Sequence, residues 1–188
     1  MAAMIAAGKT PELAEAALPE AGKILANAPD YVPALMVSAL VQEKNGDFPG
    51  AAQVYEKIYA RDPFFAPAAR RLAILYSERL GNDEKAEAFA LKARKVFTND
   101  GELDFELGLL NYRGGNFSKA IGFLQQSLAK RENDARTIFY LGMSHYELKN
   151  AAEAKSELKR ALDLKLPEKD ADDATRVLDQ LERIDPNG

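Results

Sequence analysis

YRGGNFSKAIGFLQQSLA, from Tyr112 to Ala129, repeats the pattern of EKNGDFPGAAQVYEKIYA, from Glu43 to Ala60. In both stretches a glycine is followed by a polar residue and a phenylalanine, and an alanine comes three positions after the phenylalanine. A pattern that returns within one chain indicates a repeated structural unit, and its period identifies the kind of unit.

The alanine of this pattern recurs along the chain with a nearly constant period. It stands at Ala51, Ala86, Ala120 and Ala154, which are separated by 35, 34 and 34 residues. The residues four and seven positions after each alanine are mainly small or apolar, and such positions share one face of a helix. Gly46 and Gly115 precede two of the alanines, at a place where a turn between helices favours glycine. The pattern therefore predicts pairs of helices joined by short turns.

The same periodicity places the helices along the chain. We expect them at about residues 11–28, 33–45, 49–60, 67–80, 84–97, 103–113, 117–130, 135–147 and 151–164. A further helix is expected at about residues 168–186, because apolar residues recur there on one side and charged residues on the other. Its apolar residues are Ala174, Val177, Leu178, Leu181 and Ile184. Such a helix covers the open face of the last repeat and presents a polar outer side.

A 34-residue period with a small-residue pair, a turn, an aromatic residue and an alanine resembles the tetratricopeptide repeat (TPR). The Leu-Gly pair of the family's first helix appears as Leu107-Gly108 and Leu141-Gly142. The family's tryptophan is replaced by Leu35, Ala69, Asp104 and Ile138. The resemblance implies an all-α fold, a right-handed α-solenoid of antiparallel helix pairs with about ten helices and a C-terminal capping helix.

The repeats set the expected domain organisation. Residues 1–188 are predicted to form a single TPR domain. It contains a half repeat at about 10–31, repeats at about 32–65, 66–100, 101–134 and 135–167, and the capping helix. A half repeat at the front also allows the chain to be a fragment of a longer protein.

Composition limits the function classes. The 25 basic and 29 acidic residues are well mixed and give a net charge of −4, which argues against a nucleic-acid binder. The absence of cysteine excludes disulfides, thiol catalysis and cysteine zinc sites. No apolar run approaches the length of a membrane span, and the start lacks a basic segment typical of a secretory signal. We expect a cytoplasmic or periplasmic protein without membrane insertion.

No group of residues suggests catalysis or metal binding. The single histidine, His145, occupies an inward repeat position and is expected to be packed within its repeat. The acidic run from Asp170 to Ala174 lacks the glycine and glutamate of a calcium loop and suits the first turn of a helix. Gly114-Gly115 and Gly8-Lys9-Thr10 lack the remainder of a phosphate-binding loop. We therefore expect no enzyme, no catalytic residue, no cofactor and no metal.

The resemblance implies that the first helix of each pair lines a concave groove for peptides or partner helices. By their places in the repeat, the expected lining residues are Met36, Leu40, Arg70, Ile74, Phe105, Leu109, Tyr112, Phe139, Met143 and Tyr146. Apolar and aromatic types dominate this set, so we expect an apolar or amphipathic partner. Arg70, Arg71, Arg113 and Arg136 would favour acidic groups at the rim. The family's clamp for a C-terminal carboxylate finds no match in the corresponding positions.

Three hypotheses remain open. The first is a bacterial, non-enzymatic scaffold that binds another protein or peptide in this groove. The second is a regulatory or substrate-presenting part of a larger enzyme, or of an envelope or polysaccharide-export assembly. The third is a structural protein that assembles with copies of itself, which would cover the apolar groove by homo-oligomerisation.

Overall fold

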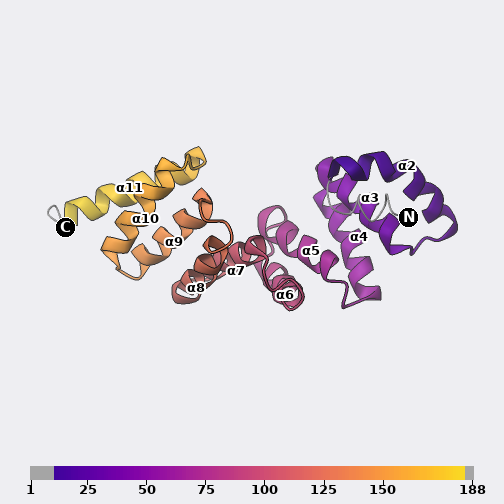
Figure 1. Ribbon diagram of the computed structural model, residues 1–188, viewed down its shortest axis with the longest axis horizontal. Coiled ribbons are helices and arrows are strands. Elements are labelled where there is room, and N and C mark those ends of the chain that lie inside the picture. Colours follow the sequence, from indigo (N-terminus) through magenta and orange to yellow (C-terminus); the bar gives the residue numbers. More distant parts are fainter. Residues whose placement is uncertain (1–10, 185–188) are drawn as a thin grey trace. The chain divides into compact units, whose positions relative to one another are not determined.

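The computed structural model describes residues 11–184, and these fold into ten helices without any strand (Figure 1). The chain divides after Val96 into two compact units, and each unit is described by itself. The expected all-α fold of about ten helices is confirmed. The expectation that residues 1–188 form a single domain stays a prediction.

Unit 1 contains five helices, each of which packs against the next. They are α2 (Pro11–Asn27), α3 (Val32–Lys44), α4 (Phe48–Arg61), α5 (Ala66–Glu78) and α6 (Asp83–Arg94). Unit 2 also contains five helices in the same kind of succession. They are α7 (Gly101–Arg113), α8 (Phe117–Leu128), α9 (Ala135–Glu147), α10 (Ala151–Asp163) and α11 (Glu168–Ile184). The observed bounds lie within a few residues of the expected ones.

Short polar side chains fix the starts of several helices. Asp47 accepts a hydrogen bond from the Gly50 amide at 2.9 Å before α4, and Asp134 accepts one from the Thr137 amide at 2.8 Å before α9. Asp100 accepts from two amides at the start of α7. These caps satisfy amide groups that have no partner inside the helix, so the helix starts are encoded locally.

The turn inside each helix pair needs one residue with left-handed backbone. Gly115 provides it between α7 and α8 with a φ of 74°. Lys149 occupies the equivalent place between α9 and α10, where the sequence has no glycine, and adopts a φ of 64°. The turn geometry is therefore kept although a side chain other than glycine raises its conformational energy there.

Glycines in unit 2 let paired helices approach closely. A Cβ atom on Gly108 of α7 would lie 2.6 Å from Leu124 Cγ of α8, and one on Gly142 of α9 would lie 2.9 Å from Leu158 Cγ of α10. Leu124 and Leu158 are fully buried. The Leu-Gly pairs noted in the sequence therefore serve close packing rather than flexibility.

The last helix closes unit 2 as expected. Ala174, Val177, Leu178 and Leu181 of α11 are buried in the same cluster as Leu158 of α10 and Ile138 of α9. The opposite side of α11 carries exposed charged residues. No helix within residues 11–184 has the length and apolar character needed to cross a membrane.

Candidate functional site

Two of the four residues expected to line a groove in unit 1 lie in the interior. Met36 and Leu40 of α3 are buried, with 6% and 2% of their surface exposed, whereas Arg70 and Ile74 of α5 are half-buried. Burial removes the two α3 side chains from the set that a ligand could contact directly. The reason is that α3 is covered on two sides, by α2 and by α4, so its apolar positions serve helix packing.

A polar network joins three helices of unit 1. The Arg71 guanidinium of α5 donates two hydrogen bonds to the Glu43 carboxylate of α3, at 2.9 and 2.7 Å. The Tyr55 hydroxyl of α4 donates to Glu43 Oε1 at 2.7 Å. Burial, followed by the neighbouring Glu43 charge, raises the pKa of Tyr55 far above its usual value. The carboxylate is thus fully engaged within the unit.

In unit 2 four of the six expected groove residues are also buried. They are Phe105, Leu109, Phe139 and Met143. Tyr112 and Tyr146 are half-buried and keep part of their rings at the surface. The helix α7 is buried on nearly all sides, since ten of its 13 residues are buried. We expected from the sequence that neighbouring helices cover only one side of each first helix, and for α7 this expectation underestimates the burial.

Rings from three helices of unit 2 form a connected group, which we call the aromatic surface. It consists of Tyr112 of α7, Phe117 of α8 and Tyr140 of α9, all half-buried. The Tyr112 ring lies 5.3 Å from the Tyr140 ring and 5.7 Å from the Phe117 ring, measured between centroids. Phe105 and Phe139 lie beneath Tyr140 at 6.1 and 5.0 Å. These distances are typical of favourable aromatic pairs.

Positive charge borders the aromatic surface. The Arg136 guanidinium lies 5.1 Å from the centroid of the Phe105 ring, and that of Arg131 lies 5.9 Å from it. Such contacts are cation–π interactions. Arg136 also acts electrostatically on Tyr140, so it borders the aromatic surface; its role at the rim of a binding groove stays a prediction.

The capping helix α11 forms one border of the same surface. The Tyr146 hydroxyl donates a hydrogen bond to Gln180 Oε1 of α11 at 2.8 Å. Burial, followed by the charges of Glu147, Tyr140 and Asp173, raises the pKa of Tyr112 to about 12. Asp173 belongs to α11, so acidic groups of that helix approach the tyrosines. Part of the expected groove is thus occupied by the chain itself.

Sequence reasoning missed Phe117 and gave Tyr140 no role in the groove. Tyr140 follows Phe139 directly and stands one period after Glu106. When a helix is buried on several sides, two consecutive residues can both contribute to the same surface. The adjacent aromatic residues Phe139 and Tyr140 were therefore the signal that the sequence offered. Phe117 belongs to the second helix of its pair, and the expected groove was built from residues of the first helices only.

Within the described residues, the side chains considered for metal binding form no metal site. No group of three or more acidic or histidine side chains within residues 11–184 is arranged to hold a metal ion. His145 is half-buried, with its Nδ1 atom 3.3 Å from Asn150 Nδ2. Asp170, Asp172 and Asp173 lie in the first turns of α11, where Asp173 pairs with Arg176. They occupy the helix start, as expected for this acidic run.

Two comparisons place the fold among known proteins. Among solved structures, YrrB, described as a TPR protein with an unusual peptide-binding site, has a TM-score of 0.73 at 18% identity, covering 87% of this chain and 84% of YrrB. A structure of MamA has a TM-score of 0.70 at 18% identity, covering 87% of this chain and 92% of MamA. No curated protein matches the chain in sequence. The family model described as the tetratricopeptide repeat matches residues 12–64 and 105–174, more than half of the chain. The chain therefore belongs to the tetratricopeptide repeat family.

Proposed function

We propose that the chain is a non-enzymatic scaffold that binds a peptide or helix of a partner protein at the aromatic surface of unit 2. The observation that carries this proposal is the row of half-buried rings of Tyr112, Phe117 and Tyr140, bordered by Arg136. Aromatic side chains are enriched in protein interfaces because they bury a large apolar area with little loss of rotamer freedom. A protein of the same fold, YrrB, is described as having a peptide-binding site.

The chemistry of this surface favours an amphipathic ligand. The rings offer apolar contact, and tyrosine hydroxyls and arginine guanidinium groups offer hydrogen bonds and positive charge at the border. An extended peptide or a helix with an apolar face and acidic neighbours satisfies both requirements. This revises the expected groove, because the ligand meets the edges of Tyr112 and Tyr140 rather than the buried Leu109 and Met143.

Selection of peptides from a random display library against the purified protein tests the proposal. Affinity is then measured by fluorescence anisotropy for the wild type and for Tyr140→Ala. We expect the substitution to weaken binding at least about tenfold, as is usual for a central aromatic contact. Tyr31→Ala is the matched control, because it removes another half-buried tyrosine but in unit 1.

The result that contradicts the proposal is equally direct. If the selected peptides bind Tyr140→Ala as tightly as the wild type, while circular dichroism shows both proteins folded, the aromatic surface is not the binding site. Sedimentation over a range of concentrations separates the alternative of self-assembly. An oligomer that Tyr140→Ala dissociates would identify a second copy, rather than a partner, as the occupant.

A further inference from the structure

The chain passes from one helix pair to the next through a short junction. In the first junction of unit 1, ion pairs lie beside a cavity of about 530 Å³ whose lining includes Asp30, Tyr31 and Arg61. Asp30 stands in the segment between α2 and α3. Its carboxylate pairs with Lys57 Nζ at 2.8 Å and with Arg61 Nη1 at 2.9 Å, both from α4. Lys57 also donates to the Pro29 carbonyl at 3.2 Å. Charged groups of this junction therefore satisfy one another.

The next junction of unit 1 has a different chemistry at the same places. Counting forward by 34 or 35 residues puts Phe64, Lys92 and Val96 in the places of Asp30, Lys57 and Arg61. The carboxylate and the guanidinium are thus both replaced by apolar groups, and the lysine is kept. In the remaining repeats the place of Phe64 is held by Asn99, Asn133 and Pro167, and that of Val96 by Asn27, Lys130 and Leu164.

The two apolar replacements meet at the wall of one cavity, which we call the junction pocket. It has a volume of about 350 Å³. Its lining includes Tyr59, Pro63, Phe64, Lys92, Lys95 and Val96. Phe64 is 90% exposed and Val96 is 61% exposed, so neither contributes appreciably to the core. Single exposed apolar residues are common, but two that converge on an apolar cavity indicate an interaction site.

Phe64 is held at the surface by a defined turn. Its amide donates to the Asp62 side chain at 3.0 Å, and the Phe65 amide donates to the Asp62 carbonyl at 3.0 Å. The Ala66 amide donates to the Phe64 carbonyl at 2.8 Å. Hydrogen bonds thus fix the backbone on both sides of the exposed ring. A ligand that contacts Phe64 would lose little affinity to ordering this segment.

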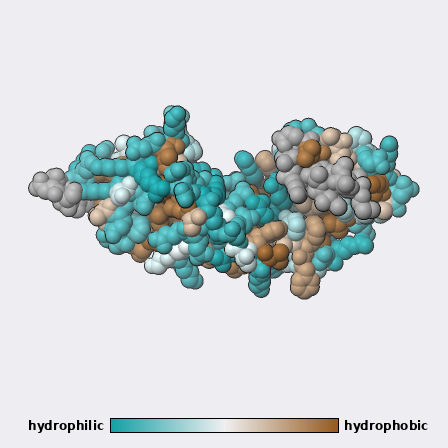
Figure 2. Space-filling view, in the orientation of Figure 1, coloured by the Kyte–Doolittle hydropathy of each residue, from teal (hydrophilic) through white to brown (hydrophobic). Residues whose placement is uncertain are grey.

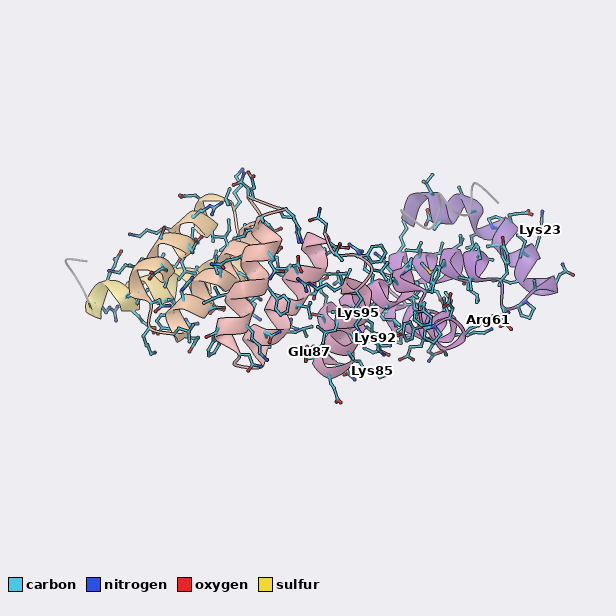
Figure 3. All side chains as sticks on the ribbon, turned by 60° about the horizontal axis from the view of Figure 1, so that its bottom comes forward. Lys23, Arg61, Lys85, Glu87, Lys92 and Lys95 are labelled. Atoms are coloured by element: carbon cyan, nitrogen blue, oxygen red, sulfur yellow. The ribbon has the colours of Figure 1, made fainter. Side chains whose placement is uncertain are left out.

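Positive charge lies at the other side of the pocket. Lys92 Nζ lies 5.0 Å from the centroid of Tyr59 and 5.2 Å from that of Phe89. Lys95 follows one turn later, and Figure 3 shows both lysines near the end of α6. Neither lysine has a carboxylate partner within residues 11–184. The place of Lys95 is held by alanine in three other repeats, at Ala26, Ala60 and Ala129, and by Asp163 in the last.

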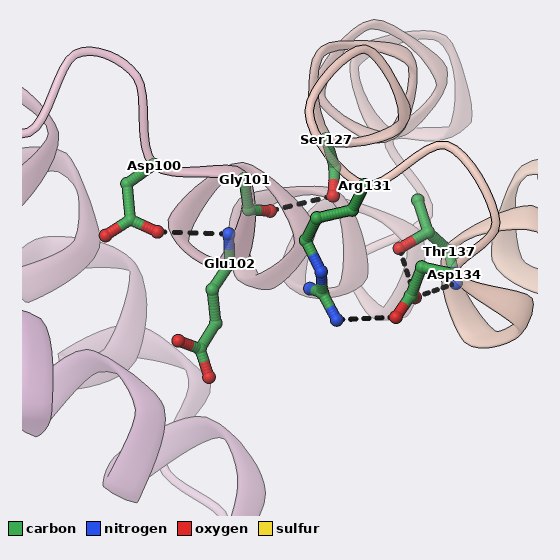
Figure 4. Close-up of polar contacts among 7 residues, drawn as sticks. All are labelled: Asp100, Gly101, Glu102, Ser127, Arg131, Asp134 and Thr137. Carbon is green, nitrogen blue, oxygen red and sulfur yellow. Dashed lines mark hydrogen bonds and ion pairs between the residues drawn. The ribbon is translucent and has the colours of Figure 1, made fainter. Parts of the chain in front are cut away.

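The corresponding junction of unit 2 shows that these features are not required by the fold. There the Ser127 hydroxyl donates to the Gly101 carbonyl at 2.7 Å, and Asp134 joins Arg131 to Thr137 (Figure 4). Lys130, in the place of Val96, pairs with the buried Asp104 at 2.6 Å. Polar groups of this junction therefore satisfy one another, and the cavity of about 650 Å³ beside them is lined by Asn99 and Lys130 where the junction pocket has Phe64 and Val96. On the face shown in Figure 2, hydrophilic side chains form most of the surface and hydrophobic groups appear as separate patches.

We infer that the junction pocket is a second, independent recognition site, which takes a peptide with a bulky apolar side chain next to acidic residues. The apolar side chain enters between Phe64, Val96 and Tyr59. The acidic groups pair with Lys92 and Lys95 and so supply the carboxylate that Asp30 supplies in the first junction. This site lies within unit 1 and depends on none of the residues of the aromatic surface.

Matched synthetic peptides test this inference on the full chain. One fluorescent peptide carries a central phenylalanine between glutamates, a second has alanine at the centre, and a third has lysines at the flanks. We expect only the first to bind measurably by fluorescence anisotropy, and its affinity to fall as salt is added, because exposed charge pairs are screened. Amide chemical shifts that change on binding are expected to lie around Phe64 and Val96.

A double substitution replaces the apolar wall of the pocket with the charged groups of the first junction. Phe64→Asp with Val96→Arg recreates the Asp30–Lys57–Arg61 arrangement around Lys92, and both positions are exposed, so the fold is retained. We expect this variant to lose at least about tenfold in affinity, because the apolar contact and the free lysine disappear together. Leu91→Asp is the matched control, since Leu91 is 46% exposed on α6, the helix that carries Lys92, but lies outside the pocket.

Three results overturn the inference. In the first, the phenylalanine–glutamate peptide binds no better than the other two peptides. In the second, Leu91→Asp weakens the binding of this peptide as much as the double substitution does. In the third, the wild type forms a dimer that the double substitution dissociates. The last result identifies a second copy as the occupant. Tyr140→Ala is expected to leave binding of this peptide unchanged, so failure here is distinct from failure of the proposed function.

Discussion

Units 1 and 2 use the same repeat positions for different interactions. In unit 1 the inner position of Arg71 supports a bidentate pair with Glu43, to which Tyr55 adds a hydrogen bond. In unit 2 the same position holds the buried Glu106 one repeat later and Tyr140 two repeats later, and Tyr140 joins a group of rings instead. A charged pair requires one geometry and is self-contained, whereas rings pack in many geometries and keep apolar area available. The comparison explains why the aromatic surface occurs in unit 2.

The two units also differ in how their helices approach each other. The first-helix position that holds Gly108 and Gly142 in unit 2 holds Ala39 and Ala73 in unit 1. The second-helix positions facing these glycines hold Leu124 and Leu158, whereas their counterparts in unit 1 are Tyr55 and Ala90. Unit 2 therefore combines the smallest residue with a large one, and removing either partner tests that arrangement.

The largest effect is expected from Leu124→Ala. It deletes a fully buried side chain that fills the space above Gly108, and we expect a loss of about 3–4 kcal/mol in the free energy of unfolding. Hydrogen exchange should show the loss of protection in α7 and α8. Ala90→Gly at the equivalent position of unit 1 should lose only about 1 kcal/mol, mainly through helix propensity. Equal losses at the two positions would contradict the comparison.

A smaller loss is expected when the polar pair of unit 1 is broken. In Arg71→Met the Glu43 carboxylate, whose side chain is only 13% exposed, loses its counter-charge. We expect urea denaturation to show about 2–3 kcal/mol less stability, because a buried charge without a partner is costly. Adding Glu43→Leu should restore part of the loss. A change below about 0.5 kcal/mol would show that the pair behaves like an exposed one.

Gly108→Ala should destabilise unit 2 by about 1–3 kcal/mol, because the new Cβ overlaps with a packed side chain. The Leu124 backbone nitrogen also lies 3.3 Å from that Cβ position, so the helices have to separate slightly. Most of the loss should disappear in the Leu124→Ala background. Gly122→Ala in α8 is the control, because nothing lies within 4 Å of its Cβ position, and it should stabilise the helix by about 0.5–1 kcal/mol.

The smallest effect concerns pH. The pKa of Tyr112 is raised to about 12, chiefly by burial, so the folded state favours the neutral phenol. Its contribution to stability is complete below the unfolded pKa of about 10 and is lost as pH rises towards the folded pKa. The stability of the wild type relative to Tyr112→Phe should therefore fall between these two values in urea denaturation. A difference that stays constant across this interval would contradict the assignment.

Much of the helical framework could be predicted from the sequence, because caps, turns and the 34-residue period are local signals. Lys149 illustrates this, since it adopts the left-handed backbone at the place that Gly115 holds one period earlier. The candidate site could be predicted only in part. Leu40, Leu109 and Met143 were assigned to a groove by their place on one helix, and their burial depends on neighbouring helices. Tyr140 and Phe117 form one surface only after three helices have packed.

The junctions between helix pairs carry a consequence for how such arrays diversify. Phe64 and Val96 stand outside the core, and the backbone turn beside them is set by Asp62. Exchanging two exposed residues can therefore convert a junction whose charges pair with one another into a junction that binds a ligand, without altering the helical scaffold. Each added repeat brings one more such junction. Binding specificity can therefore evolve separately at each junction, while selection for folding acts on the buried residues.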